Sequence, residues 1–147
     1  EFPDMSARYV AEINASELSN TKDLISLELR QYLYTGGAHG NENISFLNID
    51  PISGLEVPTE SLVTNLKDFV FFIEKKFRQK YNIPLNDSIN SSGFWFDDDT
   101  FYLPKTIGFT SNSVLVIYNQ YEIASYADGL IELEILVEDV SEFLMVK

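Results

Sequence analysis

The single histidine of the chain, His39, lies in a glycine-rich segment, residues 34–41, that holds three of the seven glycines. Imidazole can bind a metal ion, act as a general base or form hydrogen bonds near neutral pH. Glycine adopts positive φ and allows close backbone approach because it has no Cβ. Since the segment follows a strand-like run, we expect a sharp, bulged turn that presents His39 at its lip.

The sequence around His39 lacks the usual signatures of a catalytic or metal site. A zinc site normally uses several histidines or cysteines, and this chain has one histidine and no cysteine. The glycines match neither a phosphate loop nor a dinucleotide fingerprint, because the lysine and the spacing are missing. A triad with a distant serine and aspartate remains open, but no nucleophile elbow supports it. We therefore favour a structural or surface role for His39 over binding, and binding over catalysis.

Three consecutive carboxylates at residues 97–99 follow the aromatic run Phe-Trp-Phe at residues 94–96. A calcium loop would need the Asp-x-Asp-x-Asp-Gly pattern and a bidentate glutamate, and both are missing. An exposed acidic turn is the favoured interpretation, and the aromatic residues are expected to be core anchors rather than a platform for sugars. No metal, cofactor or catalytic residue is predicted.

Alternating side chains predict strands in the first third of the chain. Residues 24–34 form the clearest one, with apolar side chains at Ile25, Leu27, Leu29 and Leu33. This period of two is typical of a half-buried antiparallel strand. We expect it to form a hairpin with a short strand over residues 7–14, with a turn at residues 19–23. A further strand is predicted over residues 43–49, before a turn at residues 50–54.

One long helix is predicted over residues 61–81, because apolar residues recur there at spacings of three and four. Residues 58–61 supply caps, and Pro84 ends the helix. The basic residues of this segment lie mainly off the apolar stripe. A solvated outer face is therefore favoured over a contact with nucleic acid or membrane.

The remainder predicts a second group of strands and a short closing helix around residues 140–144. The predicted strands cover residues 100–103, 106–109, 114–118 and 130–137. The expected fold class is α+β, with two layers, in which an antiparallel sheet packs on one long helix and a short C-terminal helix follows.

Composition is consistent with a single domain over residues 1–147, with 45% hydrophobic residues. The longest aliphatic run, residues 114–117, is far too short to span a membrane. The chain starts at Glu1 without a visible signal peptide, as a processed protein or trimmed fragment would. The absence of cysteine excludes disulfides and thiol chemistry.

The net charge of −13 indicates which partners to expect. Nucleic-acid binding needs lysine and arginine to displace counterions, so this class is disfavoured, as is an anionic membrane surface. Five of the ten cations fall in residues 61–81. The remaining surface should attract cationic partners, although solubility alone is the simpler explanation of the charge.

Two motifs, read together, resemble a bacterial extracytoplasmic domain family. The first is YTGGAHG at residues 34–40, followed by NID at 48–50 and SG at 53–54, similar to the family's N-x-D and T-G pair. The second is YEIASYADG at residues 121–129, similar to the family's Y-E-I-A-P-Y-A-x-G segment. The resemblance extends over residues 8–144. The family forms the sensor region of RsiV-type lysozyme-sensing anti-sigma factors and also occurs beside peptidoglycan deacetylase domains and in many lipoproteins.

This resemblance implies an antiparallel sheet packed on helices and an extracytoplasmic location, whether periplasmic, lipoprotein-anchored or secreted. It admits lysozyme recognition, for which an acidic surface suits a very basic enzyme. Ser125 departs from the family's usual proline, which leaves that turn less rigid. The deacetylase domain, the transmembrane segment and the sigma-binding part do not occur in this sequence.

Three hypotheses follow. The first is a non-enzymatic binding or sensor module of the cell envelope, with lysozyme or another cationic protein as partner. The second is a domain that binds peptidoglycan or another glycan through exposed aromatic residues, and the third is a hydrolase or deacetylase centred on His39. The residues expected to bind a partner are Tyr34, Gly36, Gly37, His39, Tyr121 and Tyr126.

Overall fold

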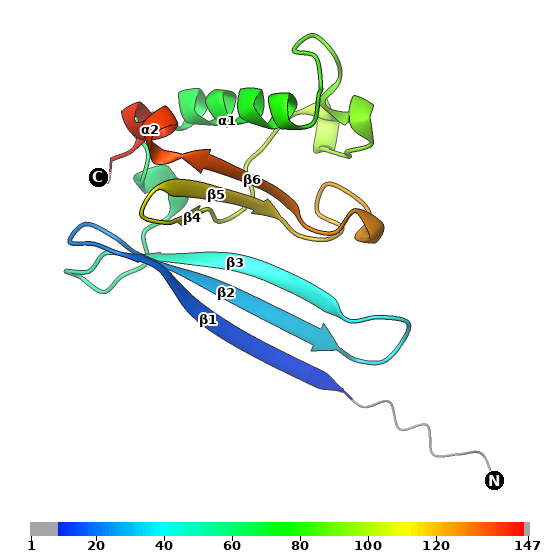
Figure 1. Ribbon diagram of the computed structural model, residues 1–147, viewed down its shortest axis with the longest axis horizontal. Coiled ribbons are helices and arrows are strands. Elements are labelled where there is room, and N and C mark those ends of the chain that lie inside the picture. Colours follow the sequence, from blue (N-terminus) through cyan, green and yellow to red (C-terminus); the bar gives the residue numbers. More distant parts are fainter. Residues whose placement is uncertain (1–8, 146–147) are drawn as a thin grey trace.

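Two antiparallel sheets of three strands each and one long helix are stacked in the described part of the chain, residues 9–145 of a computed structural model (Figure 1). The first sheet has the order β1-β2-β3 and comprises β1 (Val10–Asn20), β2 (Ile25–Tyr34) and β3 (Asn41–Ile49). The second has the order β4-β5-β6 and comprises β4 (Gly108–Phe109), β5 (Ser113–Tyr118) and β6 (Ile131–Leu136). The helix α1 (Leu66–Lys80) lies over the second sheet, next to the short helix α2 (Val137–Val140).

These elements confirm the α+β class with a main helix and a short C-terminal helix. Helix α2 and β6 meet at Val137, where the predicted last strand gives way to the closing helix. Short 3-10 turns occur at Thr59–Ser61, Ile89–Ser92, Asp97–Asp99, Tyr126–Asp128 and Ser141–Phe143. Within residues 9–145, no helix combines the length and the apolar character needed to cross a bilayer.

The predicted hairpin of the first two strands is confirmed, but β1 is longer than expected. Its pairing with β2 continues to Asn20, opposite Ile25, so the turn predicted at residues 19–23 is confined to its later part. A register shift between Glu17 and Ser19 marks a bulge, and Leu18 packs against the small core between the sheets. Residues 7 and 8 of the predicted first strand lie outside the described residues.

Helix α1 begins at Leu66, not at residue 61, so the predicted start is wrong. The side chain of Asn65 accepts hydrogen bonds from the backbone N–H groups of Lys67 and Asp68, which caps the helix there. Leu62 and Val63 precede this cap and are buried outside the helix. Because these two apolar residues have helical spacing relative to Leu66 and Phe69, the sequence pattern predicts one helical turn more than the structure has.

The main core lies between α1 and the second sheet and is rich in aromatic rings. The ring of Phe77 lies 5.0 Å from that of Phe94, 5.5 Å from that of Phe96 and 6.1 Å from that of Tyr118, measured between centroids. Phe94 and Phe96 thus act as the core anchors that the sequence predicts. Trp95 differs, because 45% of its surface is exposed.

The two sheets are held together through the segment that contains β4. Ser26 Oγ accepts a hydrogen bond from Phe109 N at 3.1 Å, and Asn48 Nδ2 donates to Ile107 O at 2.9 Å. Gly108 lies so close to the first sheet that a Cβ there would be 2.5 Å from the Phe46 ring. Because these backbone groups bind side chains of the first sheet, only two residues of the predicted strand 106–109 pair as β4. The strand predicted at residues 100–103 does not form.

Candidate functional site

The loop between β2 and β3 turns sharply, as the glycine-rich sequence predicts. Gly36 and Gly37 have φ of 96° and 101°, values that residues with a side chain rarely adopt. The hydroxyl of Tyr34 donates to the carbonyl of Gly37 at 3.1 Å, which ties the end of β2 to the loop. Gly40 is needed for a different reason, since a Cβ there would lie 2.4 Å from the Tyr32 ring.

This loop places His39 against a side chain that is distant in sequence. The His39 and Tyr126 rings stack, with centroids 3.8 Å apart and planes 21° from parallel. The Tyr126 hydroxyl also donates to the carbonyl of Gly40 at 3.1 Å. The two chain segments that carry the family-like motifs therefore meet at one corner of the molecule, one from each sheet.

Tyr121 continues this row of rings. Its centroid lies 5.7 Å from that of Tyr126, and 57% of its surface is exposed. Its backbone has φ of +67°, a left-handed conformation that costs a non-glycine residue on the order of 1–2 kcal/mol. We call His39, Tyr121 and Tyr126 the aromatic corner. Strain at an exposed aromatic residue is typical of a position shaped for contact rather than for packing.

The turn that carries Tyr126 is fixed by a capping box. Ser125 Oγ donates to a carboxylate oxygen of Asp128 at 2.5 Å, and Ser125 N donates to the same oxygen at 3.0 Å. Ser125 has φ of −69°, which is close to the value that proline imposes. The serine thus keeps the backbone angle expected for the family's proline and replaces ring rigidity with two hydrogen bonds.

The geometry of His39 favours contact over proton transfer. Its Nδ1 lies 3.0 Å from the Gly40 carbonyl, which can only accept, so Nδ1 carries the proton. In the neutral ring Nε2 is then an acceptor, and the residue as a whole is exposed. Among residues 9–145, no carboxylate or hydroxyl side chain makes a hydrogen bond to this ring. A base oriented by a carboxylate, as a hydrolytic triad needs, is not assembled in that part of the chain.

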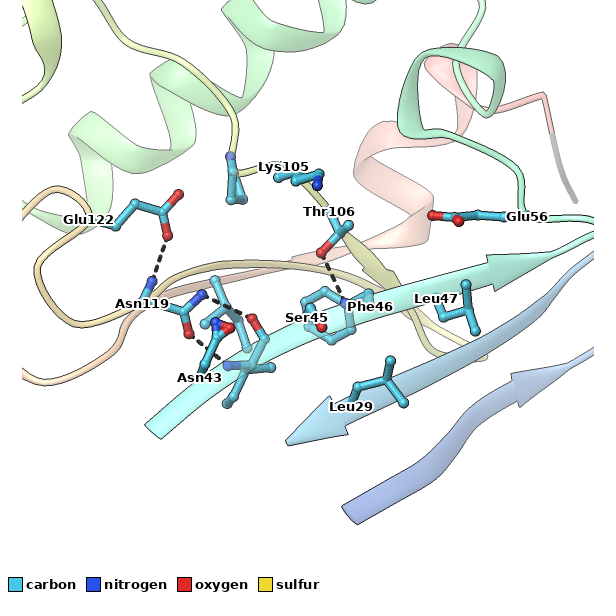
Figure 2. A pocket seen from close by; sticks show the side chains of 13 residues that line it. Leu29, Asn43, Ser45, Phe46, Leu47, Glu56, Lys105, Thr106, Asn119 and Glu122 are labelled. Atoms are coloured by element: carbon cyan, nitrogen blue, oxygen red, sulfur yellow. Dashed lines mark hydrogen bonds between the residues drawn. The ribbon is translucent and has the colours of Figure 1, made fainter. Parts of the chain in front are cut away.

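A hollow of about 370 Å³ lies along the free edge of β3 (Figure 2). We call it the β3 groove. Its charged side chains are Glu56, Lys105 and Glu122, and Leu29 and Leu47 provide apolar surface. Glu122 adjoins Tyr121, so the turn at residues 119–122 contributes to both the groove and the aromatic corner.

Side chains from residues 106 and 119 form hydrogen bonds with backbone groups of β3 along this groove. Ile44 N donates to Asn119 Oδ1 at 2.7 Å, and Asn119 Nδ2 donates back to Ile44 O at 2.9 Å. Phe46 N donates to Thr106 Oγ1 at 2.9 Å. These bonds, drawn in Figure 2, protect part of a strand edge that could otherwise pair with another chain.

The N-x-D element of the first motif has a structural role. The amide of Asn48 holds the β4 segment, as described above. Asp50 Oδ1 accepts hydrogen bonds from Ile52 N at 2.8 Å and Ser53 N at 3.3 Å. These bonds lower the pKa of the Asp50 carboxyl group below its ordinary value, and Gly54 completes the turn with φ of +72°.

The acidic run at residues 97–99 also organises a turn. Asp99 Oδ1 accepts from the hydroxyl of Ser88 at 2.6 Å and from Asn90 N at 3.2 Å. The Ser88 hydrogen bond is the main cause of the lowered pKa of the Asp99 carboxyl group. Within residues 9–145, no group of three or more His, Asp or Glu side chains has the arrangement of a metal site.

The structure thus groups the predicted binding residues. It brings His39, Tyr121 and Tyr126 into contact, while Tyr34, Gly36 and Gly37 shape the loop that supports His39. Sequence reasoning missed Asn119, which ties β3 to the turn after β5. One sequence carries no signal for a hydrogen bond between residues 75 positions apart.

Comparisons with known proteins agree on the fold. A family model described as a protein of unknown function, DUF3298, matches residues 59–138, more than half of the chain. This range includes the second motif and begins after the first motif. A search of curated proteins found no match.

Two solved structures resemble the chain over almost its whole length. A DUF3298 family protein from Pseudomonas aeruginosa PAO1 has a TM-score of 0.67 and 20% identity, and the match covers 95% of this chain and 64% of that one. A DUF3298 family member from Bacteroides fragilis NCTC 9343 has a TM-score of 0.75 and 22% identity, with 92% and 54% covered. This chain therefore spans less than two thirds of either relative, and the likeness establishes the fold. On the evidence of the family model and these neighbours, the chain belongs to the DUF3298 family of proteins of unknown function.

Proposed function

We propose that this chain is a non-enzymatic binding module of the bacterial cell envelope, acting outside the cytoplasm, that docks a cationic protein through the aromatic corner. The observation that carries the proposal is the stack of His39 on Tyr126, with exposed Tyr121 beside it. Tyrosine is enriched at binding hot spots because it offers a large rigid surface with a polar tip.

The charge distribution supports a cationic partner. The basic side chains of α1 are largely engaged within the chain: Lys76 Nζ lies 2.8 Å from Asp139, and Arg78 Nε lies 2.8 Å from Glu74. Lys75 lies over the Phe71 ring, 4.2 Å from its centroid. The acidic side chains elsewhere outnumber the cations, and Glu122 stands next to Tyr121. A basic protein would be steered toward this surface, most strongly at low salt.

Lysozyme is the named candidate partner. It is a very basic enzyme, and the two motifs resemble the sensor domain of lysozyme-sensing anti-sigma factors. In this proposal the corner contributes contact surface, and the surrounding acids contribute encounter rate and orientation.

Titration calorimetry with lysozyme at low and physiological salt tests the proposal. We expect binding at both, weaker at higher salt, and a loss of about tenfold in affinity for Tyr121→Ala, as for a moderate hot spot. Phe71→Ala removes an equally exposed ring on α1 and should leave affinity unchanged. The absence of binding heat at both salt concentrations would exclude lysozyme as the partner. Unchanged affinity for Tyr121→Ala would exclude the aromatic corner as the binding surface.

Glycan binding is the second candidate, because a further exposed aromatic residue lies near the motif. Trp95 is 45% exposed, and its backbone N–H donates to the carbonyl of Ile123 at 3.0 Å, which places it beside the second motif. Sugars stack on such rings. Titration with soluble peptidoglycan fragments should then change the fluorescence of Trp95, the only tryptophan. An unchanged spectrum would argue against this candidate.

A further inference from the structure

The first sheet has one face that no other element of the described chain covers. The second sheet and both helices lie on its opposite side (Figure 1). Strand pairing places Ile13, Gln31 and Asn43 side by side on the uncovered face. Every second residue along each strand, counted from these three, points to the same face. We call this the outer face. Its aliphatic side chains are Ala11, Ile13, Ala15, Ile25, Leu27, Leu29, Leu33, Leu47 and Ile49.

These side chains belong to neither hydrophobic core of the described residues. Ile13 is 73% exposed and Leu33 is 51% exposed. The paired positions carry one charged residue, Glu17, in a chain with 22% charged residues. Depletion of charge over a continuous apolar patch is typical of the centre of a protein interface.

We infer that the outer face binds a second copy of this chain, forming a two-fold symmetric sandwich of two first sheets. Sheets pack face to face at about 10 Å through apolar side chains of this kind. A two-fold axis that runs parallel to the strands places β1 of each copy over β3 of the other. The outer face of one copy then packs on the outer face of the other, and every contact between the copies occurs twice.

Shape on the outer face suits this arrangement. Ile13 projects from β1, and the β3 groove lies at the opposite side of the same face, lined by Leu29 and Leu47. Strand pairing sets Ile13 level with Asn43, at one end of the groove. Rotation about an axis parallel to the strands does not change a residue's position along the strand direction. Ile13 of each copy therefore meets the groove of the other.

Charge beside the outer face is also complementary under this symmetry, because Lys105 lines the β3 groove at the edge of that face. Glu17 on β1 pairs with Leu27 on β2, and Leu27 pairs with Leu47 on β3, so Glu17 and Leu47 lie at the same position along the strands. Lys105 stands beside β3 at that level, because its neighbour Thr106 accepts a hydrogen bond from Phe46 N. Neither Glu17 nor Lys105 forms an ion pair within residues 9–145. The two-fold axis sets Glu17 of each copy near Lys105 of the other.

The area is sufficient for a specific dimer. β2 has ten residues, and three strands of that length span roughly 33 by 14 Å, or about 470 Å² per copy before side-chain relief is counted. Two copies bury on the order of 1,000 Å² or more, the lower limit for a specific interface. Each copy carries a net charge of −13. Self-association should therefore strengthen as salt rises, which is opposite to the docking of a cationic protein.

Sedimentation velocity over a concentration series, at low and high salt, tests this inference. We expect a monomer–dimer equilibrium that shifts to dimer with salt, and a loss of roughly tenfold or more in dimer affinity for Ile13→Lys. Ile13 is too exposed for its replacement to unfold the chain. Phe71→Lys adds the same charge on α1 and should leave the dimer intact.

A charge swap tests the symmetry itself. Glu17→Lys and Lys105→Glu should each weaken the dimer, while the double variant, which keeps the net charge, should restore it. Failure of the double variant to recover would overturn the proposed pairing. A chain that stays monomeric at every salt and binds an apolar dye would overturn the dimer and leave the outer face to another polypeptide segment. None of these outcomes depends on whether lysozyme binds.

Discussion

At the scale of single residues, Tyr126 links the two sheets at the aromatic corner. Its hydroxyl donates to the Gly40 carbonyl, and its ring stacks on His39. Tyr126→Phe keeps the stack and removes the hydrogen bond, so we expect a loss of about 1 kcal/mol in the free energy of unfolding. Urea denaturation measures it. Tyr121→Phe is the matched control, and an equal loss there would contradict a specific role for the Tyr126 hydroxyl.

Asp50 provides a prediction for the effect of pH. Hydrogen bonds from Ile52 N and Ser53 N hold its pKa below the ordinary 3.8. A carboxylate with a lowered folded-state pKa stabilises the fold above the unfolded-state pKa and loses this effect as pH falls through the folded value. Asp50→Asn keeps an acceptor oxygen but does not titrate.

The thermal stability of the native chain should therefore fall more steeply below about pH 4 than that of Asp50→Asn. Melting curves of both proteins from about pH 5 to pH 2 measure the difference. Parallel curves for the two proteins would show that the turn at residues 50–54 does not depend on the ionised carboxylate.

At the scale of elements, the contact between β4 and the first sheet determines how the sheets are joined. A methyl group on Gly108 would meet the Phe46 ring, which is buried, so Gly108→Ala should cost roughly 1–3 kcal/mol by overpacking. In Gly40→Ala the methyl group meets Tyr32, which is 39% exposed and free to move outward. Guanidinium unfolding should rank Gly108→Ala as the more destabilised variant, and the reverse order would contradict this view of sheet docking.

Elements with an unambiguous period were predictable from the sequence. The alternation in residues 24–34 and 130–137 gave β2 and β6 because side-chain period is a local property. The helix start was misjudged because Leu62 and Val63 have helical spacing but precede the Asn65 cap. The strand predicted over residues 106–109 is longer than β4, because backbone groups there form hydrogen bonds with side chains that are distant in sequence.

The candidate site was predictable only through the motif resemblance. Glycine content indicated the turn at residues 36–37, and the structure gives both glycines positive φ. The contact of His39 with Tyr126 joins residues on two different sheets, and no local pattern encodes it. The sequence predicts a single antiparallel sheet, and the structure has two. The meeting of His39 and Tyr126 therefore depends on how the sheets dock.

At the scale of the whole molecule, two surfaces differ in chemistry. The aromatic corner lies beside Glu122 and Asp128 in a chain with a net charge of −13, whereas the outer face of the first sheet is nearly free of charge. Binding at the first should weaken with salt, and self-association at the second should strengthen. A salt series on one preparation therefore separates the two.

The central claim is that the aromatic corner is the docking surface for a cationic protein. An NMR titration of isotope-labelled chain with unlabelled lysozyme tests it most directly, because backbone amide signals report contacts residue by residue. We expect the largest shift changes at Gly37, His39, Tyr121 and Tyr126, with smaller changes on α1. Saturable changes confined to the outer face or to α1, or no changes at low salt, would contradict the account.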